Sequence, residues 1–223
     1  MSGVSGPPVR VAVPELRRMA PDVVRILGLP LGQADETAEM VAWTEAAVGG
    51  ALRFIHENRA RLLWSPRPRV TLVTRRSHES TLDAGGGSLL EFGVRIADFA
   101  CAEASSFGHA RVVVRKTYGS VFVPYLAWRA RRLGCGLAVR QPGTGGAGAR
   151  ADASPEGLFD LELLAECATG ESDPPDADPS LRSRHDASVR EGVAVAPEDF
   201  RSFVQLFEML RAPTSERSRT HAG

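Results

Sequence analysis

The residues with the clearest chemical potential in this sequence are Lys116 and Tyr118, within the run RKTYGS at positions 115–120. This run follows an apolar segment at 112–114 and precedes an expected helix from Val121, so it should lie at the carboxyl end of a strand. Ligands of open α/β sheets bind at that edge. A lysine and a phenol there could hold a carboxylate, or move a proton if their surroundings lowered their pKa values. The alternative is a solvent-exposed strand-to-helix turn.

A glycine-rich motif follows the next apolar segment. Gly143, Gly145 and Gly148 satisfy G-x-G-x-x-G, and Asp160 lies at a distance compatible with a ribose-binding acid. A dinucleotide fingerprint also needs a helix whose N-terminus holds the pyrophosphate. Because residues 149–154 are too short for such a helix, we interpret the motif as a flexible loop.

Other catalytic motifs lack support. The histidines, His56, His78, His109, His185 and His221, form no HxxxH or HxxE pair, so we expect no metal site. His78 with Glu79 and Asp83 forms a polar cluster at an expected turn, where solvated side chains are common. The chain contains neither a G-x-S-x-G elbow nor a G-x-x-x-x-G-K-[ST] phosphate loop.

Composition limits the function classes. The 223 residues carry 27 basic and 27 acidic side chains, and this zero net charge argues against nucleic acid or an anionic membrane as the main partner. Cys101, Cys135 and Cys167 form no CxxC pair, which predicts neither a disulfide framework nor a zinc ribbon. No apolar run is long enough to span a membrane. We therefore expect a soluble cytoplasmic protein.

Hydrophobic periodicity predicts alternating elements. Helical spacing covers residues 16–27, 34–62, 89–107, 121–133 and 197–210, and strand patterns occur near 70–73, 81–84, 112–114, 136–139 and 158–164. Gly49 and Gly50 interrupt the second helical pattern and mark a break or a close approach of a ligand. Strand–helix–strand order implies a crossover and a sheet with helices packed on it. We predict an α/β fold with a small sheet of three to four strands flanked by helices.

The expected organisation is a single α/β domain over residues 12–211. A disordered tail at 1–11 precedes it, and a second tail at 212–223 follows it. Within the domain, residues 12–66 and 180–211 form a helical lobe in which the first and last helices pack together, 67–165 form the sheet region, and 166–179 form a loop.

The order of these segments resembles the malate/L-lactate dehydrogenase-like family, whose nicotinamide-binding fold is not a Rossmann fold. The resemblance spans roughly residues 12–141 and 182–210. It depends on many short matches in the right order: Leu27-Gly28-Leu29-Pro30, Thr44-Glu45-Ala46-Ala47, Trp64-Ser65-Pro66-Arg67-Pro68, Leu82-Asp83-Ala84-Gly85, Val114-Arg115-Lys116-Thr117-Tyr118-Gly119, then Tyr125, Ala130, Gly134 and Gly136, and Glu191-Gly192-Val193 with Pro197. The C-terminal end, with Pro213-Thr214-Ser215, Ser218-Arg219 and Ala222-Gly223, is also similar to that of a bacterial family of the same length whose activity is not characterised.

Members of the resembled family reduce 2-oxo acids or cyclic imines with NADH or NADPH, and this chain departs from them in three places. The segment carrying the family's catalytic histidine is replaced by Gly49-Gly50 leading into Ala51. Tyr118 stands where the second family histidine is expected. The central cofactor-binding portion after Gln141 is short. The resemblance thus implies NAD or NADP as cofactor, while the departures predict that its binding is lost.

Three functions are consistent with these observations. The favoured one is a reduced relative of the oxidoreductases that binds a small anionic metabolite, with weak or lost redox activity. In this hypothesis Tyr118 donates the proton, Lys116 holds the carboxylate, and the substrate is contacted by Thr117, Gly119, Ser120, Gly49 and Gly50. The second is a pseudoenzyme or accessory subunit that contacts a second copy of the chain or a full-length homologue through an apolar patch. The third is a lyase or isomerase that uses Lys116 as a base or imine former.

Overall fold

The computed structural model describes residues 6–29, 31–64, 69–140, 157–167 and 178–210. Its helices are α1 (Val13–Ile26), α2 (Leu31–Ala47), α3 (Ala51–Trp64), α4 (Leu89–Phe107), a 3₁₀ turn η1 (Ser120–Phe122), α5 (Val123–Arg132), α6 (Pro179–Glu191) and α7 (Pro197–Glu208). Its strands are β1 (Val9–Val11), β2 (Thr71–Arg76), β3 (Glu79–Asp83), β4 (His109–Thr117), β5 (Cys135–Arg140), β6 (Phe159–Cys167) and β7 (Val193–Val195).

The main sheet has five strands in the order β2-β3-β4-β6-β5. Strands β3 and β4 are parallel and are connected through α4, whereas the other neighbouring pairs are antiparallel. The predicted α/β class is therefore confirmed, but the prediction of three to four strands was too low. Strands β3, β4 and β6 are paired on both sides and are the interior strands of this sheet.

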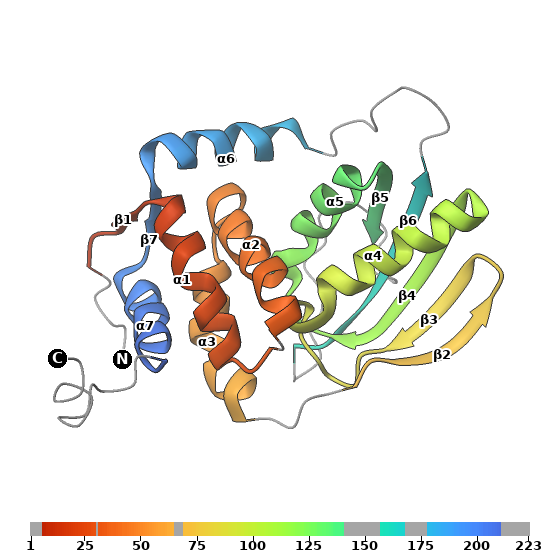
Figure 1. Ribbon diagram of the computed structural model, residues 1–223, viewed down its shortest axis with the longest axis horizontal. Coiled ribbons are helices and arrows are strands. Elements are labelled where there is room, and N and C mark those ends of the chain that lie inside the picture. The colour runs from red at the N-terminus through yellow and green to blue at the C-terminus, as the bar shows by residue number, and fades with distance from the viewer. Residues whose placement is uncertain (1–5, 30, 65–68, 141–156, 168–177, 211–223) are drawn as a thin grey trace, which may run out of the picture.

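Helices α4 and α5 lie across one face of this sheet (Figure 1). Strands β4 and β6 present alternating residues to α4, and Val112, Val114, Leu161 and Leu163 are each fully buried there. The period of two places Arg111 on the opposite face, where it forms an ion pair with Glu162 of β6. One face of the sheet thus supplies apolar core and the other carries charge, as expected for a half-buried sheet.

The remaining helices form a lobe beside the sheet (Figure 1). Helix α1 packs against both α2 and α7, so the expected contact between the first and last helices is present. The prediction that residues 1–11 form a disordered tail was wrong for Val9–Val11, because this segment pairs as β1 with β7 and Val11 is 1% exposed. Within the described residues, no helix combines the length and apolarity needed to cross a membrane.

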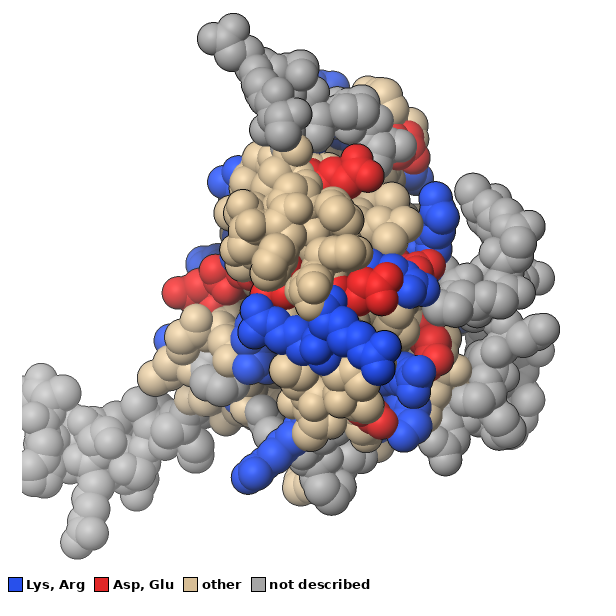
Figure 2. Space-filling model, turned by 90° about the vertical axis from the view of Figure 1, so that its right-hand side faces the viewer, with Lys and Arg blue, Asp and Glu red and all other residues tan. Residues whose placement is uncertain are grey.

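Charge on the end of the sheet that carries the β2–β3 turn is mixed (Figure 2). A band of basic side chains crosses this face and is bordered by acidic ones. Two ion pairs at the sheet illustrate this mixing: Arg75 lies 2.6 Å from Glu103, and Arg111 lies 3.5 Å from Glu79. At least part of the positive charge at this sheet is therefore paired with acidic side chains.

Candidate functional site

A cavity of about 310 Å³ opens between α3 and the turn that follows β4. Its lining residues are Gly50, Arg53, Phe54, Glu57, Asn58, Arg61, Tyr118, Gly119, Ser120, Val121 and Gly157. Four of the residues predicted from the sequence, Gly50, Tyr118, Gly119 and Ser120, therefore lie around one space. A hollow thus lies beside Tyr118.

Two residues with left-handed backbone conformations shape the end of β4 and the turn that follows it. Lys116 has φ +56° and lies within an irregularity in the pairing of β4 with β6, and Gly119 has φ +93°. A Cβ atom on Gly119 would lie only 3.1 Å from Cζ of Phe54 and 3.2 Å from Oγ of Ser88. Glycine is therefore required here both by backbone conformation and by space.

Tyr118 forms a wall of the cavity beneath an arginine. The guanidinium carbon of Arg61 lies 3.8 Å from the centroid of the Tyr118 ring, and the Phe54 ring centroid lies 5.7 Å from that of Tyr118. Burial raises the pKa of Tyr118 to about 12, although the charge of Arg61 acts in the opposite direction. The phenol therefore stays protonated at neutral pH and can donate a hydrogen bond. It is a much weaker acid than the histidine expected at this position.

Helix α3 brings three charged groups to the cavity. Arg53 and Glu57 form an ion pair at 2.8 Å, and Nη2 of Arg61 donates to the backbone oxygen of Gly86 at 3.0 Å. The described lining therefore contains two guanidinium groups and one carboxylate, an excess of positive charge. Sequence reasoning missed these residues, although their i, i+4, i+8 spacing places them on one side of a helix.

The start of α3 is held by a buried acid from α2. Oε2 of Glu45 accepts a hydrogen bond from the backbone N–H of Leu52 at 2.9 Å, and Gly49 and Gly50 join the two helices with φ +84° each. Burial raises the pKa of Glu45 above its ordinary value, while hydrogen bonds from the backbone of Leu52, Gly50 and Ala51 oppose the rise. The glycine break predicted from the sequence thus positions the helix that carries Arg53 and Arg61.

Three predicted residues do not line the cavity. The exposed Lys116 places Nζ 2.7 Å from Oδ2 of Asp83, and this contact holds the pKa of Asp83 below its ordinary value. Thr117 is fully buried, and its hydroxyl donates to the backbone oxygen of Gly87 at 3.1 Å. Gly49 is likewise outside the lining. The roles of Lys116 as carboxylate holder, base or imine former receive no support from this placement.

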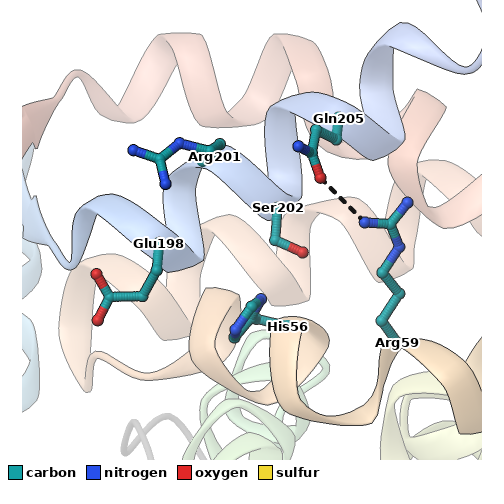
Figure 3. A pocket seen from close by; sticks show the side chains of 6 residues that line it. All are labelled: His56, Arg59, Glu198, Arg201, Ser202 and Gln205. Atoms are coloured by element: carbon teal, nitrogen blue, oxygen red, sulfur yellow. Dashed lines mark hydrogen bonds between the residues drawn. The ribbon is translucent and has the colours of Figure 1, made fainter. Parts of the chain in front are cut away.

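A second cavity, of about 210 Å³, lies between α3 and α7 (Figure 3). Its lining residues are His56, Arg59, Glu198, Arg201, Ser202 and Gln205. The Ser202 side chain extends from α7 between those of His56 and Arg59, and Arg59 donates to Gln205 at 3.2 Å. None of the site residues predicted from the sequence lies here, so the cavity beside Tyr118 remains the candidate functional site.

Comparison with known proteins identifies the fold. No protein-family model and no curated protein matches the sequence. Among solved structures, the malate dehydrogenase of Pyrococcus horikoshii OT3 aligns with a TM-score of 0.69 at 9% identity, covering 95% of this chain and 99% of that one. The chain has a malate/lactate dehydrogenase-like fold. The resemblance inferred from the order of the sequence segments is confirmed at this level.

Other structures with this fold are named for different substrates. The sulfolactate dehydrogenase of Methanocaldococcus jannaschii aligns with a TM-score of 0.65 at 12% identity, over 91% of this chain and 98% of that one. The Δ1-piperideine-2-carboxylate reductase of Pseudomonas syringae pvar. tomato aligns with a TM-score of 0.55 at 10% identity, over 89% and 99% of the respective chains. Each of these names describes a dehydrogenase or reductase, and at these identities the likeness shows the fold alone.

The cavity beside Tyr118 has the size of a small-molecule site. Its volume of about 310 Å³ is near the lower end of the range of about 300–1,000 Å³ for small-molecule sites. The glycine motif at Gly143, Gly145 and Gly148 lies outside the described residues.

Proposed function

We propose that this chain binds a small carboxylate of the 2-oxo or 2-hydroxy acid class in the cavity beside Tyr118. The observation that carries this proposal is the Arg61 guanidinium, placed over the Tyr118 ring on the wall of a cavity with excess positive charge. A planar guanidinium suits a planar carboxylate, and stacking on an aromatic ring pre-orients it. The malate/lactate dehydrogenase-like fold supports this substrate class.

The same site supports only weak redox chemistry, or none. Reduction of a ketone requires an acid that delivers a proton to the developing alkoxide. Tyr118 stands nearest to that role, but its pKa of about 12 makes its proton much harder to transfer than that of a histidine, whose ordinary pKa is about 6.5. We therefore expect binding to persist and turnover to be slow or absent. The prediction that binding of NAD or NADP is lost needs a titration of its own.

Calorimetric titration of the full chain with pyruvate, L-malate and methyl pyruvate tests the proposal. The two acids should bind, and the neutral ester should bind much more weakly because it lacks the carboxylate. Arg61→Gln should weaken binding of the acids by at least about tenfold, the loss expected for one charge-assisted hydrogen bond. Arg59→Gln is the matched control, since Arg59 lies on the same helix but lines the second cavity.

Thermal unfolding of both variants checks that each is folded. Equal binding of acid and ester, or equal affinity of Arg61→Gln and the wild type, would contradict the proposal. Titration with NADH and NADPH, with and without pyruvate, addresses the redox expectation separately. Tight cofactor binding with turnover would show that this chain has kept the activity that we expect to be weak or lost.

One observation favours the second candidate, an accessory subunit acting through protein contact. Strand β2 is the outer strand of the described sheet, and all six of its residues are exposed. Leu72 and Val73 are 53% and 51% exposed on this strand. An unpaired strand edge with apolar side chains can pair with another chain. Slower hydrogen exchange at β2 with rising protein concentration would support this candidate.

A further inference from the structure

The three cysteines, which stand far apart in the sequence, meet at one end of the sheet. Cys135 begins β5, Cys167 ends β6, and Cys101 lies on α4, the helix that packs on β6. All three are free thiols. Sγ of Cys135 lies 3.3 Å from Sγ of Cys167, and the Cys135 thiol is 3.8 Å from the backbone oxygen of Cys101. The fold therefore assembles a thiol cluster that the spacing of the cysteines did not predict.

Strand register brings two of these cysteines directly opposite each other. Cys135 and Cys167 are partners in the antiparallel pairing of β5 with β6. The N–H of Cys167 donates to the backbone oxygen of Gly108 and therefore points toward β4, away from β5. Cys135 and Cys167 thus form a non-hydrogen-bonded pair of the antiparallel ladder. Residues in a non-hydrogen-bonded antiparallel pair have Cα atoms about 4.5 Å apart. This separation falls within the range of about 4.4–6.8 Å found across disulfides. The backbone already has a separation suited to a bridge.

We propose that Cys135 and Cys167 form a reversible disulfide site whose oxidising substrate is a small-molecule disulfide, with Cys167 as the thiol that reacts first. Cys101 and Cys135 are buried, whereas Cys167 is half-buried and can meet a reagent from solvent. The hydroxyl of Ser105 donates to the backbone oxygen of Cys101 at 2.9 Å, and its oxygen lies 3.3 Å from Sγ of Cys167, where it can accept a hydrogen bond from that thiol. Because Cys167 is the more accessible thiol, it should react with the small-molecule disulfide before Cys135 does.

The chemistry balances with glutathione disulfide as the oxidant. The Cys167 thiol loses its proton and attacks one sulfur of glutathione disulfide, forming a mixed disulfide and releasing one glutathione thiolate, which takes up a proton. The Cys135 thiol then loses its proton and attacks the sulfur of Cys167, forming the protein disulfide and releasing the second glutathione. Two protein thiols are oxidised by two electrons, and one glutathione disulfide is reduced to two glutathione thiols.

Cys101 is the thiol left over. Burial raises its pKa to about 12, and the neighbouring thiols of Cys135 and Cys167 add to the rise. Because the thiolate is the nucleophile, burial slows the reaction of Cys101. Burial raises the pKa of Cys135 as well, so position rather than acidity distinguishes the two thiols. Cys101 is on a helix, where no strand register places it opposite a second cysteine. We therefore expect the bridge to join β5 to β6 and to leave Cys101 reduced.

The thiol cluster and the carboxylate cavity lie at opposite ends of β4. Cys167 bonds to Gly108, just before β4 begins, whereas Tyr118 follows the last residue of that strand. The disulfide site is therefore independent of the proposed function. Either inference can fail while the other stands.

Redox titration of the wild-type chain tests the site. The protein is equilibrated in glutathione buffers from fully reduced to fully oxidised, quenched with acid, unfolded, and labelled with a maleimide that adds a known mass to each thiol. We expect three labels in reducing buffer and one in oxidising buffer, from a chain with three cysteines. Peptide mapping should show Cys135 joined to Cys167, and return to reducing buffer should restore the two lost labels.

Single serine variants assign the partners. The Cys101→Ser variant keeps Cys135 and Cys167 and should still form the disulfide, so its two maleimide labels should both be lost on oxidation. Cys135→Ser should stop at the first step, with one glutathione trapped on Cys167, whereas Cys167→Ser should form no protein disulfide. If Cys135→Ser does not fold, Cys135→Ala gives the same reading at a buried site. Three labels in every buffer, or a bridge that includes Cys101, would overturn the proposal.

Discussion

At the scale of single residues, two glycines with similar backbone angles face different surroundings. Gly119 has φ +93° and Gly49 has φ +84°. A Cβ on Gly119 would press against Phe54 and Ser88, whereas a Cβ on Gly49 would meet nothing within 4 Å. A side chain at Gly119 would therefore suffer both backbone strain and crowding in the cavity wall, whereas a side chain at Gly49 would suffer backbone strain alone.

This contrast predicts unequal costs for the same substitution. Gly49→Ala should lower the free energy of unfolding by about 1–2 kcal/mol, the cost of the left-handed conformation for a residue with a Cβ. Gly119→Ala should cost more, by about 1–3 kcal/mol, because Phe54 must also move in a packed site. Urea unfolding of the two variants measures the difference. Equal destabilisation would show that the wall around Gly119 yields freely.

At the scale of elements, the position of α3 depends on the acid that caps it. Glu45 of α2 is 5% exposed and accepts the N–H of Leu52 in the first turn of α3. The ends of helices leave backbone N–H groups without partners inside the helix, so this carboxylate replaces solvent at a buried terminus. The same helix then presents Arg53 and Arg61 to the cavity. Helix α3 therefore connects its cap at Glu45 with the arginines of the proposed binding site.

The raised pKa of Glu45 predicts a specific pH dependence. Because the folded chain holds this proton more tightly than the unfolded chain, Glu45 contributes stability below its ordinary pKa of 4.5, and that contribution is lost as pH rises through the folded value. The free energy of unfolding of the wild type, relative to that of Glu45→Gln, should therefore fall as pH rises above 4.5.

Denaturant unfolding of both proteins from acid to neutral pH measures that difference. Glu45→Ala provides a second comparison at neutral pH. It removes the acceptor of the Leu52 N–H altogether and should cost about 1–3 kcal/mol. A pH-independent difference between the wild type and Glu45→Gln would contradict the assignment of the shift to Glu45.

At the scale of the whole molecule, the sheet is unevenly supported. Strand β4 is paired on both sides and packs against α4, whereas β2 is paired only with β3 among the described strands and is exposed throughout. Regions with few buried contacts open with lower free energy than the core. The β2 edge should therefore be the least protected part of the sheet.

Hydrogen exchange followed by mass spectrometry tests this expectation. Peptides covering β2 should exchange much faster than those covering β4, at every protein concentration, because opening of an outer strand is a local event. The same experiment distinguishes the two candidate functions. Protection of β2 that grows with protein concentration would favour the accessory-subunit candidate, since a second copy of the chain would then cover the edge.

The sequence by itself determined much of the local structure. Hydrophobic period and turn residues located every strand of the main sheet, the glycine break at Gly49 and Gly50, and the run 115–120 at the end of a strand. These features depend on neighbours along the chain, so a single sequence contains them. The predicted count of three to four strands was too low, because a local pattern does not reveal that all five segments pair into one sheet.

Only the tertiary structure decided which side chains meet. The left-handed backbone at Lys116 and its ion pair with Asp83 place that lysine outside the cavity, while the packing of α3 brings Arg61 onto Tyr118. The pairing of β5 with β6 sets Cys135 opposite Cys167 across 32 positions of sequence. Such contacts depend on long-range register and helix packing, because a shift of one residue turns a strand's side chains to its other face.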